Sequence, residues 1–245
     1  MKKILTALIL FPTLCFSQTA YEIIKKSDEH LRGYSNHAEL SIEVIRPKWS
    51  RTIEVKTWSL GNEYSMILLL APARDKGSVF LKRETEIWNW QPKIEKIIKL
   101  PPSMMMQSWM GSDFTNDDLI KESSVLKDYN HSLIGDTLIQ NLDCYIIELI
   151  PKPEAAIVWG KIHSYIDKKD FLQLESRFYD EDGYLINKME ASEIKNLGGR
   201  LLPSIMVMTP VEEDGQQTTL RYKSIEFDLP LEASFFSKQN MKRLR

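Results

Sequence analysis

The sequence contains few of the residues that build crosslinks or metal sites. Its 245 residues include two cysteines and four histidines, and the histidines are scattered along the chain. It has no zinc-type motif, no Gly-x-Ser-x-Gly nucleophile elbow and no phosphate-binding glycine loop. We therefore expect no metal, no cofactor and no catalytic residue of these kinds, and we interpret each histidine as a surface residue or as a strand residue with a local hydrogen bond. The histidines are His30, His37, His131 and His163.

The sequence also lacks an excess of charge of either sign. Its 32 basic and 34 acidic residues leave a formal net charge of −2, and no long basic block occurs. Proteins that bind nucleic acid usually carry a basic surface, because they neutralise phosphates. The chain is therefore a poor candidate for binding nucleic acid.

No apolar run reaches the length of a membrane span. The run at residues 4–14 is shorter than the roughly 20 residues that a span needs, and it follows Lys2 and Lys3. Cys15 and Ser17 place small residues at positions −3 and −1 of a cleavage site, so residues 1–17 are predicted to be a signal peptide. A lipid anchor on Cys15 is the alternative, but Leu14 stands where such anchors normally have a small residue.

The predicted mature protein, residues 18–245, is interpreted as a single domain located in the periplasm. Without Lys2 and Lys3 it keeps 30 basic residues against 34 acidic ones, a formal charge of −4. Cys144 is its one cysteine, so an internal disulfide is excluded and stability must come from the apolar core.

Periodicity predicts one N-terminal helix followed by many strands. Apolar residues at helical spacing indicate a helix over residues 21–32, which Gly33 ends. From His37 onward apolar and polar residues alternate, and turn signals between the later runs indicate an antiparallel meander. A sheet of about a dozen strands must curl or close on itself. Strands are predicted over residues 37–44, 51–60, 63–71, 78–82, 86–91, 94–100, 129–134, 141–150, 161–167, 172–179, 185–195, 202–209 and 218–227.

A methionine-rich segment interrupts the strands. Residues 103–110 are predicted to form a short helix that begins at Ser103 and ends at Gly111, with a second short turn over residues 113–120. Four methionines and one tryptophan lie in the seven residues 104–110. Methionine is flexible, so such a helix can repack around ligands of differing shape, although an ordinary core face remains the alternative.

Two strands favour the ligand interpretation. Residues 66–70 are apolar on both faces, and two tryptophans lie on one side of residues 87–90. A strand of this kind must be covered on both faces, and few helices are available to do so. We therefore predict an apolar ligand cavity, and we expect aspartate at Trp109 or Met106 to abolish binding, although a one-residue slip would reverse the strand faces. The predicted lining is Met66, Leu68, Leu70, Trp88 and Trp90 from the sheet and Met105, Met106, Trp109 and Met110 from the opposite side.

Three carboxylates offer a rival interpretation as an enzyme. Asp113, Asp117 and Asp118 lie close together in the sequence and could supply acid and base groups for a reaction on envelope lipids. The favoured alternative is structural, because acidic residues before Leu119 are typical of a helix N-terminus. A nucleophile and a separate base are missing, so we predict that the protein is not an enzyme.

The order of residues resembles the LolA-like outer-membrane lipoprotein-sorting proteins, and in particular a branch whose members are often associated with transporters of the resistance-nodulation-division (RND) type. The resemblance covers the mature chain. It includes the helix at 21–33, Arg-Pro-Lys-Trp-Ser-Arg at 46–51 and Trp-Asn-Trp-Gln-Pro-Lys at 88–93. Its most specific part is Met-Gly-Ser-Asp-Phe-Thr-Asn-Asp-Asp-Leu at 110–119.

The resemblance implies a mainly β (α+β) fold, a strongly curved, half-open antiparallel β-barrel with short helices as a lid over an apolar cavity. It implies a periplasmic carrier of lipid or lipoprotein acyl chains, which it shuttles from an inner-membrane transporter of the ABC or RND type to an outer-membrane acceptor, with transient membrane contact. It also implies a basic residue that holds the lid closed, for which Arg51 is the nearest candidate. An adaptor of an RND-type transporter without bound lipid remains the alternative.

Overall fold

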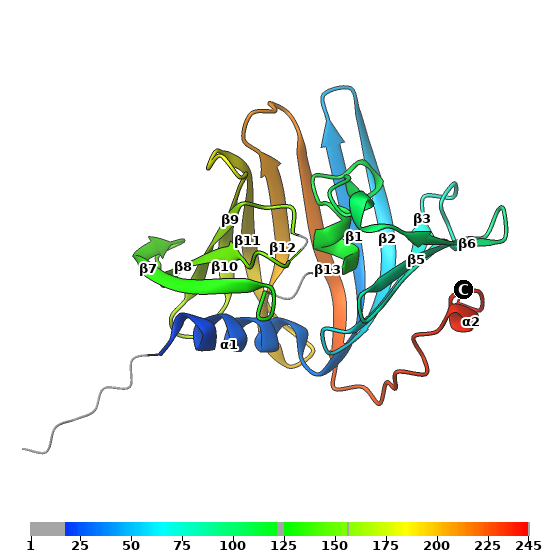
Figure 1. The fold of residues 1–245 in the computed structure, drawn as a ribbon, viewed down its shortest axis with the longest axis horizontal. Helices are drawn as coiled ribbons and strands as arrows, with labels where there is room; N and C mark the ends of the chain where they lie inside the picture. Colours follow the sequence, from blue (N-terminus) through cyan, green and yellow to red (C-terminus); the bar gives the residue numbers. More distant parts are fainter. Residues whose placement is uncertain (1–17, 122–124, 156, 245) are drawn as a thin grey trace, which may run out of the picture.

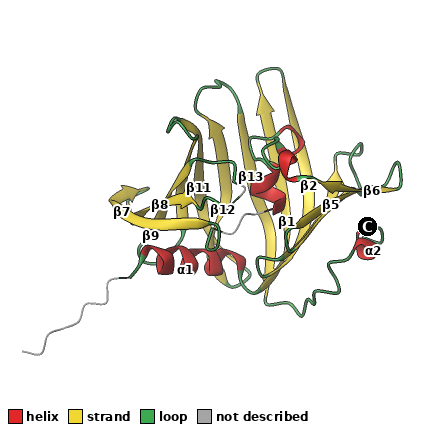
Figure 2. Ribbon diagram, in the orientation of Figure 1, coloured by secondary structure: helices red, strands yellow, loops and turns green. Residues whose placement is uncertain are grey.

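The described residues form one large, curved antiparallel sheet with few helices. The structure is a computed structural model that describes residues 18–121, 125–155 and 157–244, so the predicted signal peptide lies outside it. The helix α1 (Ala20–Arg32) lies across the lower end of the concave face in Figure 1. Figure 2 shows how small the helical share is. The other helical segments are η1 (Pro102–Met104), η2 (Trp109–Gly111), η3 (Asp117–Lys121) and α2 (Lys238–Met241).

Two meanders make up the sheet. The strand order is β6-β5-β4-β3-β2-β1-β13-β12-β11-β10-β9-β8-β7, so β1 and β13 join the two meanders while β6 and β7 form the edges. Since these edges do not pair with each other, the sheet curves without closing. The strands are β1 (Ser35–Arg46), β2 (Trp49–Leu60), β3 (Tyr64–Ala71), β4 (Val79–Arg83), β5 (Glu86–Gln91), β6 (Lys96–Leu100), β7 (Tyr129–Ile139), β8 (Leu142–Pro151), β9 (Lys161–Asp167), β10 (Gln173–Tyr179), β11 (Leu185–Leu197), β12 (Arg200–Pro210) and β13 (Gln217–Phe227).

The predicted mainly β fold and the large antiparallel sheet are confirmed, and so is the N-terminal helix. Thr19 and Glu22 form a capping box at the start of α1, in which the backbone N–H of each residue donates to the other's side chain, at 2.9 and 3.2 Å. Gly33 ends the helix with a φ of 65°, a conformation that glycine adopts without steric cost. Among the described residues, no helix combines the length and the apolar character that a membrane span requires.

The main core lies on the concave face of the sheet. The alternation in β1 puts Ala38, Leu40, Ile42 and Val44 on that face, where all four are buried. The isoleucines of α1, at positions 23 and 24, pack into the same cluster. Residues 101–121 contribute Met105, Trp109 and Phe114 to this cluster, so they cover the concave face together with helix α1.

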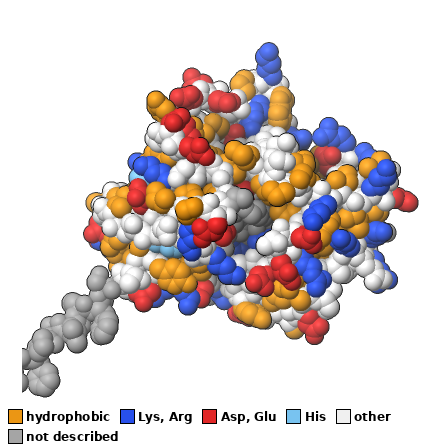
Figure 3. Space-filling view, in the orientation of Figure 1, with side chains coloured by type: hydrophobic (Ala, Val, Ile, Leu, Met, Phe, Trp, Pro, Cys, Tyr) orange, Lys and Arg blue, Asp and Glu red, His pale blue; other side chains and the backbone are white. Residues whose placement is uncertain are grey.

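A second apolar cluster lies on the opposite face of β3, β4 and β5. There the C-terminal segment passes under the sheet and ends in α2, which is red in Figure 1. Phe236 and Met241 from this segment are fully buried against the strands. The C-terminal segment thus covers an outer face that would otherwise be exposed and apolar. Over the side shown in Figure 3, hydrophobic side chains are dispersed among charged ones.

Candidate functional site

A cavity of about 150 Å³ lies between α1, the concave face of the sheet and residues 101–121, which we call the lid. Most of its wall is apolar and comes from alternate residues of β1, β2, β3 and β13. Leu31 closes the helix side, and Trp109 and Leu119 close the lid side. The sheet contributes Ala38, Leu40, Ile42, Val55, Thr57, Ile67, Leu220, Tyr222 and Ile225, among others.

The lid differs from the predicted helix over residues 103–110, and that prediction is wrong. The segment contains two single 3-10 turns, η1 and η2, and Met110 has a φ of 50°. Its backbone groups bond across the loop instead of along a helix: Trp109 N–H donates to the Phe114 carbonyl at 2.8 Å and Asn116 N–H to the Gln107 carbonyl at 2.9 Å. These cross-loop bonds replace the helical ladder and bring residues 104–110 against 112–117.

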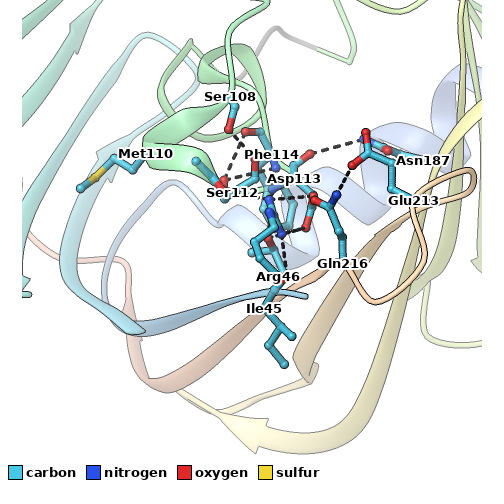
Figure 4. A network of polar contacts seen from close by, with 12 residues as sticks. Ile45, Arg46, Ser108, Met110, Ser112, Asp113, Phe114, Asn187, Glu213 and Gln216 are labelled. Carbon is cyan, nitrogen blue, oxygen red and sulfur yellow. Dashed lines mark hydrogen bonds and ion pairs between the residues drawn. The ribbon is translucent and has the colours of Figure 1, made fainter. Parts of the chain in front are cut away.

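A buried ion pair holds the lid to the sheet. Arg46, at the end of β1, donates through its Nη1 and Nη2 atoms to both carboxylate oxygens of Asp113, at 3.1 and 2.9 Å. Arg46 Nη2 also donates to the Gly111 carbonyl at 2.8 Å, and the Thr218 hydroxyl of β13 donates to Asp113 Oδ2 at 2.7 Å. The side chains of Arg46 and Asp113 are 12% and 5% exposed, so this forked pair is shielded from solvent. Figure 4 shows this network, with Met110 pointing away from it.

Arg51, the residue predicted to hold the lid, donates from Nη2 to the carbonyl of Met110. Sequence reasoning missed Arg46, which makes the ion pair. The sequence contained a signal for it. Arg46 follows Val44 by two residues and Ile42 by four, so its side chain points to the same inward face of β1. A charged side chain at the next inward position indicates a buried partner.

The structure separates the four predicted lid-side residues. Met105 and Trp109 are buried in the main core, and Trp109 lies 6.0 Å from the ring of Phe80. Met110 is half-buried, whereas the side chain of Met106 is 64% exposed. The predicted common face of Met106, Trp109 and Met110 does not form, because it depended on a regular helix.

The five predicted sheet-side residues lie on the face opposite the cavity. Met66, Leu68, Trp88 and Trp90 belong to the cluster covered by the C-terminal segment, and Leu70 packs against it. The inward positions of β3 are Ile67 and Leu69 instead. Both faces of β3 are covered, as its two-sided apolar pattern required, but a protein segment covers the face that was assigned to the ligand.

The acidic residues of the lid have structural partners. Asp113 is held in the ion pair, and Asp118 Oδ2 accepts hydrogen bonds from Thr115 N–H and Oγ1, at 2.7 and 2.9 Å. The indole N–H of Trp159 donates to Asp118 Oδ1 at 3.4 Å. Burial raises the pKa of Asp118 to about 6, against the lowering effect of the Thr115 and Trp159 hydrogen bonds. These contacts favour the capping role over catalysis.

The raised pKa of Asp118 predicts that acid stabilises this site. The folded protein holds the Asp118 proton more tightly than the unfolded chain, so its contribution grows as pH falls and is lost as pH rises through about 6. From pH 7.5 to 5 the wild type should gain about 1.4 kcal/mol in free energy of unfolding that Asp118→Asn does not gain. Urea denaturation at both pH values measures this difference, with the exposed Asp214→Asn as control. Equal pH dependence in wild type and Asp118→Asn would contradict the prediction.

The histidines make separate local contacts. His30 bonds to the Leu201 carbonyl at 2.8 Å, and His37 bonds to the Thr57 carbonyl at 2.9 Å. His131 and His163 contact the Val125 carbonyl and Glu148, respectively. In the part of the chain that the structure describes, no three His, Cys, Asp or Glu residues come together as a metal site.

Comparison with known proteins gives one family match and several solved structures with a similar fold. The model of a family described as "Uncharacterized protein" matches residues 61–243, most of the chain. No curated protein matches the sequence. Similar solved structures include a DUF1329 family protein from Desulfovibrio piger, with a TM-score of 0.80 over 91% of this chain and 97% of that one, at 22% identity.

Two further solved structures are similar to this chain to about the same degree. A putative outer membrane lipoprotein-sorting protein domain from Vibrio parahaemolyticus gives a TM-score of 0.81 at 22% identity, over 91% of this chain and 98% of the other. A LolA superfamily protein from Nitrosomonas europaea gives 0.79 at 22% identity, over 91% and 99%. At this level of identity the similarities show a shared fold.

Proposed function

We propose that this chain is a carrier of lipid or lipoprotein acyl chains. It belongs to the family whose model covers residues 61–243, and it shares the fold of LolA superfamily proteins, which supports the proposal. The observation that carries the proposal is the apolar cavity between α1, the lid and the concave face. Such a cavity binds by shape and apolar contact and needs no catalytic group.

The size of the cavity implies that the lid moves. A cavity of about 150 Å³ admits a group about as large as benzene, which is far smaller than a long acyl chain. Burial of a chain gains about 0.8 kcal/mol per methylene, enough to offset the opening of a lid held by a few polar contacts. Opening must break the Arg46–Asp113 pair, the Thr218–Asp113 hydrogen bond and the Arg51 contact, among others.

The carrier would work in the periplasm after removal of residues 1–17. It would receive its cargo from an inner-membrane transporter of the ABC or RND type and deliver it to an outer-membrane acceptor. A tightly bound chain leaves only when the cavity closes or a partner offers a better site, so release would require the acceptor. Contact with either membrane would be transient.

Native mass spectrometry of the protein purified from the periplasm without detergent tests the proposal. We expect an added mass that solvent extraction converts into a phospholipid, fatty acid or acylated peptide. A bare protein mass, together with no uptake of offered lipids, would contradict the carrier function and favour the transporter adaptor.

A matched pair of substitutions in β2 locates the bound chain. Thr57 lines the cavity, whereas Thr52 is exposed on the other face of the same strand. Thr57→Phe fills the cavity and is expected to weaken binding of a fluorescent fatty acid at least tenfold, while overpacking costs about 1–3 kcal/mol of stability. Thr52→Phe should bind as the wild type does. Equal affinity in both variants would place the chain elsewhere.

A further inference from the structure

A second hollow, of about 420 Å³, lies beside the lid on the side of β3 and β4. Arg32 is the charged residue in the wall of the acyl cavity, whereas this hollow is lined by charged groups of both signs. Arg51, Arg74 and Asp75 contribute to its wall, together with Trp49, Leu69 and Met110. It therefore combines an apolar floor with two cations and one anion.

Two buried polar atoms of this hollow have no hydrogen-bond partner among the described residues. They are Arg51 Nε and Asp75 Oδ2. Neighbouring atoms of the same groups are engaged: Arg51 Nη2 donates to the Met110 carbonyl, and Asp75 Oδ1 accepts from Arg74 Nε at 3.3 Å. The side chains of Arg74 and Asp75 are 72% and 21% exposed, so the hollow presents a cation and an anion to a ligand that accepts at one point and donates at another.

The hollow continues the acyl cavity along the same two strands. On the inward face of β2, Val55 lines the cavity and Arg51 lines the hollow, and on β3 the corresponding pair is Ile67 and Leu69. Ile67 and Leu69 are two positions apart, which is about 7 Å along the strand, and Val55 and Arg51 are four positions apart, which is about 13 Å. The lid residues Trp109 and Met110 lie at the junction, so one amphiphilic molecule can reach both spaces when the lid moves.

We propose that this hollow binds a phospholipid head group that carries both a phosphate and a primary amine. The inference rests on the proposed acyl carrier function and names the class of lipid. The guanidinium groups of Arg51 and Arg74 line the hollow, and Arg74 is 72% exposed, so they donate to phosphate oxygens. The carboxylate of Asp75 accepts a hydrogen bond from the ammonium group. A trimethylated amine has no N–H to donate and forms no hydrogen bond with Asp75.

Head-group preference of the delipidated full mature protein tests the proposal. Three lipids with identical acyl chains are compared by displacement of a fluorescent fatty acid: a phosphoethanolamine lipid, a phosphocholine lipid and a diacylglycerol without phosphate. We expect the phosphoethanolamine lipid to bind at least about tenfold more tightly than either of the others, as a charge-assisted hydrogen bond predicts. Soluble phosphoethanolamine should bind at least about a hundredfold more weakly than the lipid, because it lacks the acyl chains.

The variant Asp75→Asn separates the head-group site from the acyl cavity. It should lose the preference for ethanolamine over choline while its affinity for the fatty acid stays unchanged, and Asp214→Asn should behave as the wild type does. Equal affinity of the wild type for all three lipids would overturn the head-group proposal and leave the carrier function intact. Binding of soluble phosphoethanolamine as tight as the lipid's would assign the hollow to a soluble phosphate ester. Failure of every acyl compound to bind would overturn the carrier function itself.

Discussion

The variant Arg46→Ala is expected to lower the free energy of unfolding by about 3–5 kcal/mol, because the lid loses its ion pair with the sheet. It leaves the carboxylate of Asp113, which is 5% exposed, without its cationic partner and with Thr218 as the remaining side chain that donates to it. Removal of one member of a buried ion pair costs this much because the other charge stays buried and uncompensated. Urea denaturation measures the global change, and hydrogen exchange at the amides of Trp109 and Asn116 measures opening of the lid alone.

Two controls distinguish the buried pair from charge in general. Lys25 and Glu29 form an exposed i,i+4 pair on α1, with side chains 48% and 62% exposed. Lys25→Ala should change stability by no more than about 0.5 kcal/mol. Adding Asp113→Asn to an Arg46→Met variant should recover part of the loss, because it removes the unpaired charge. A loss below 1 kcal/mol for Arg46→Ala, with the lid amides still protected, would show that the pair does not hold the lid.

The variant Trp109→Asp is expected to weaken acyl binding at least a hundredfold. Trp109 is 1% exposed, lines the cavity and packs near Phe80. A carboxylate at this position faces an apolar wall and must either draw water into the cavity or be expelled with the lid, and both outcomes remove the apolar surface that a chain would contact. Fluorescent fatty acid titration measures the loss, and circular dichroism checks that the sheet persists.

Met106 supplies the matched control for the lid. Its side chain is 64% exposed, so Met106→Asp should leave acyl binding unchanged, in contrast to the expectation from a regular helix. Trp109→Phe keeps an aromatic group in the core and should retain binding within about tenfold of the wild type. If Trp109→Asp and Met106→Asp bound equally well, the lid would not contact the acyl chain.

Most of the fold could be predicted because it depends on local patterns. The alternation from Ala38 to Val44 places one face of β1 in the core, and turn residues such as Gly61 separate the strands. The helix α1 has its own cap at Thr19 and its stop at Gly33. These signals act over a few residues, and for that reason the element types can be inferred from the order of residues.

The lid was predicted only in part. Four methionines and a tryptophan correctly indicated a segment with an apolar side, since Met105 and Trp109 are buried. The regular helix was wrong because the backbone bonds run across the loop, for example from Asn116 to Gln107. Bonds of that kind depend on how residues 112–117 fold back against residues 104–110. Helical periodicity in the sequence does not predict them.

The sequence alone determined that this protein is a β-rich chain with a large antiparallel meander, a capped N-terminal helix and a surplus of apolar strand faces. Only the tertiary structure decided which face of β3 meets the cavity. Met66 and Leu68 are as apolar as Ile67 and Leu69, so the assignment depends on which distant segment covers each side. The C-terminal segment covers the outer face, and the lid, joined to the sheet through Arg46 and Asp113, covers the inner one. Contacts between residues 67 positions apart are set by the packing of the whole sheet, which no local pattern encodes.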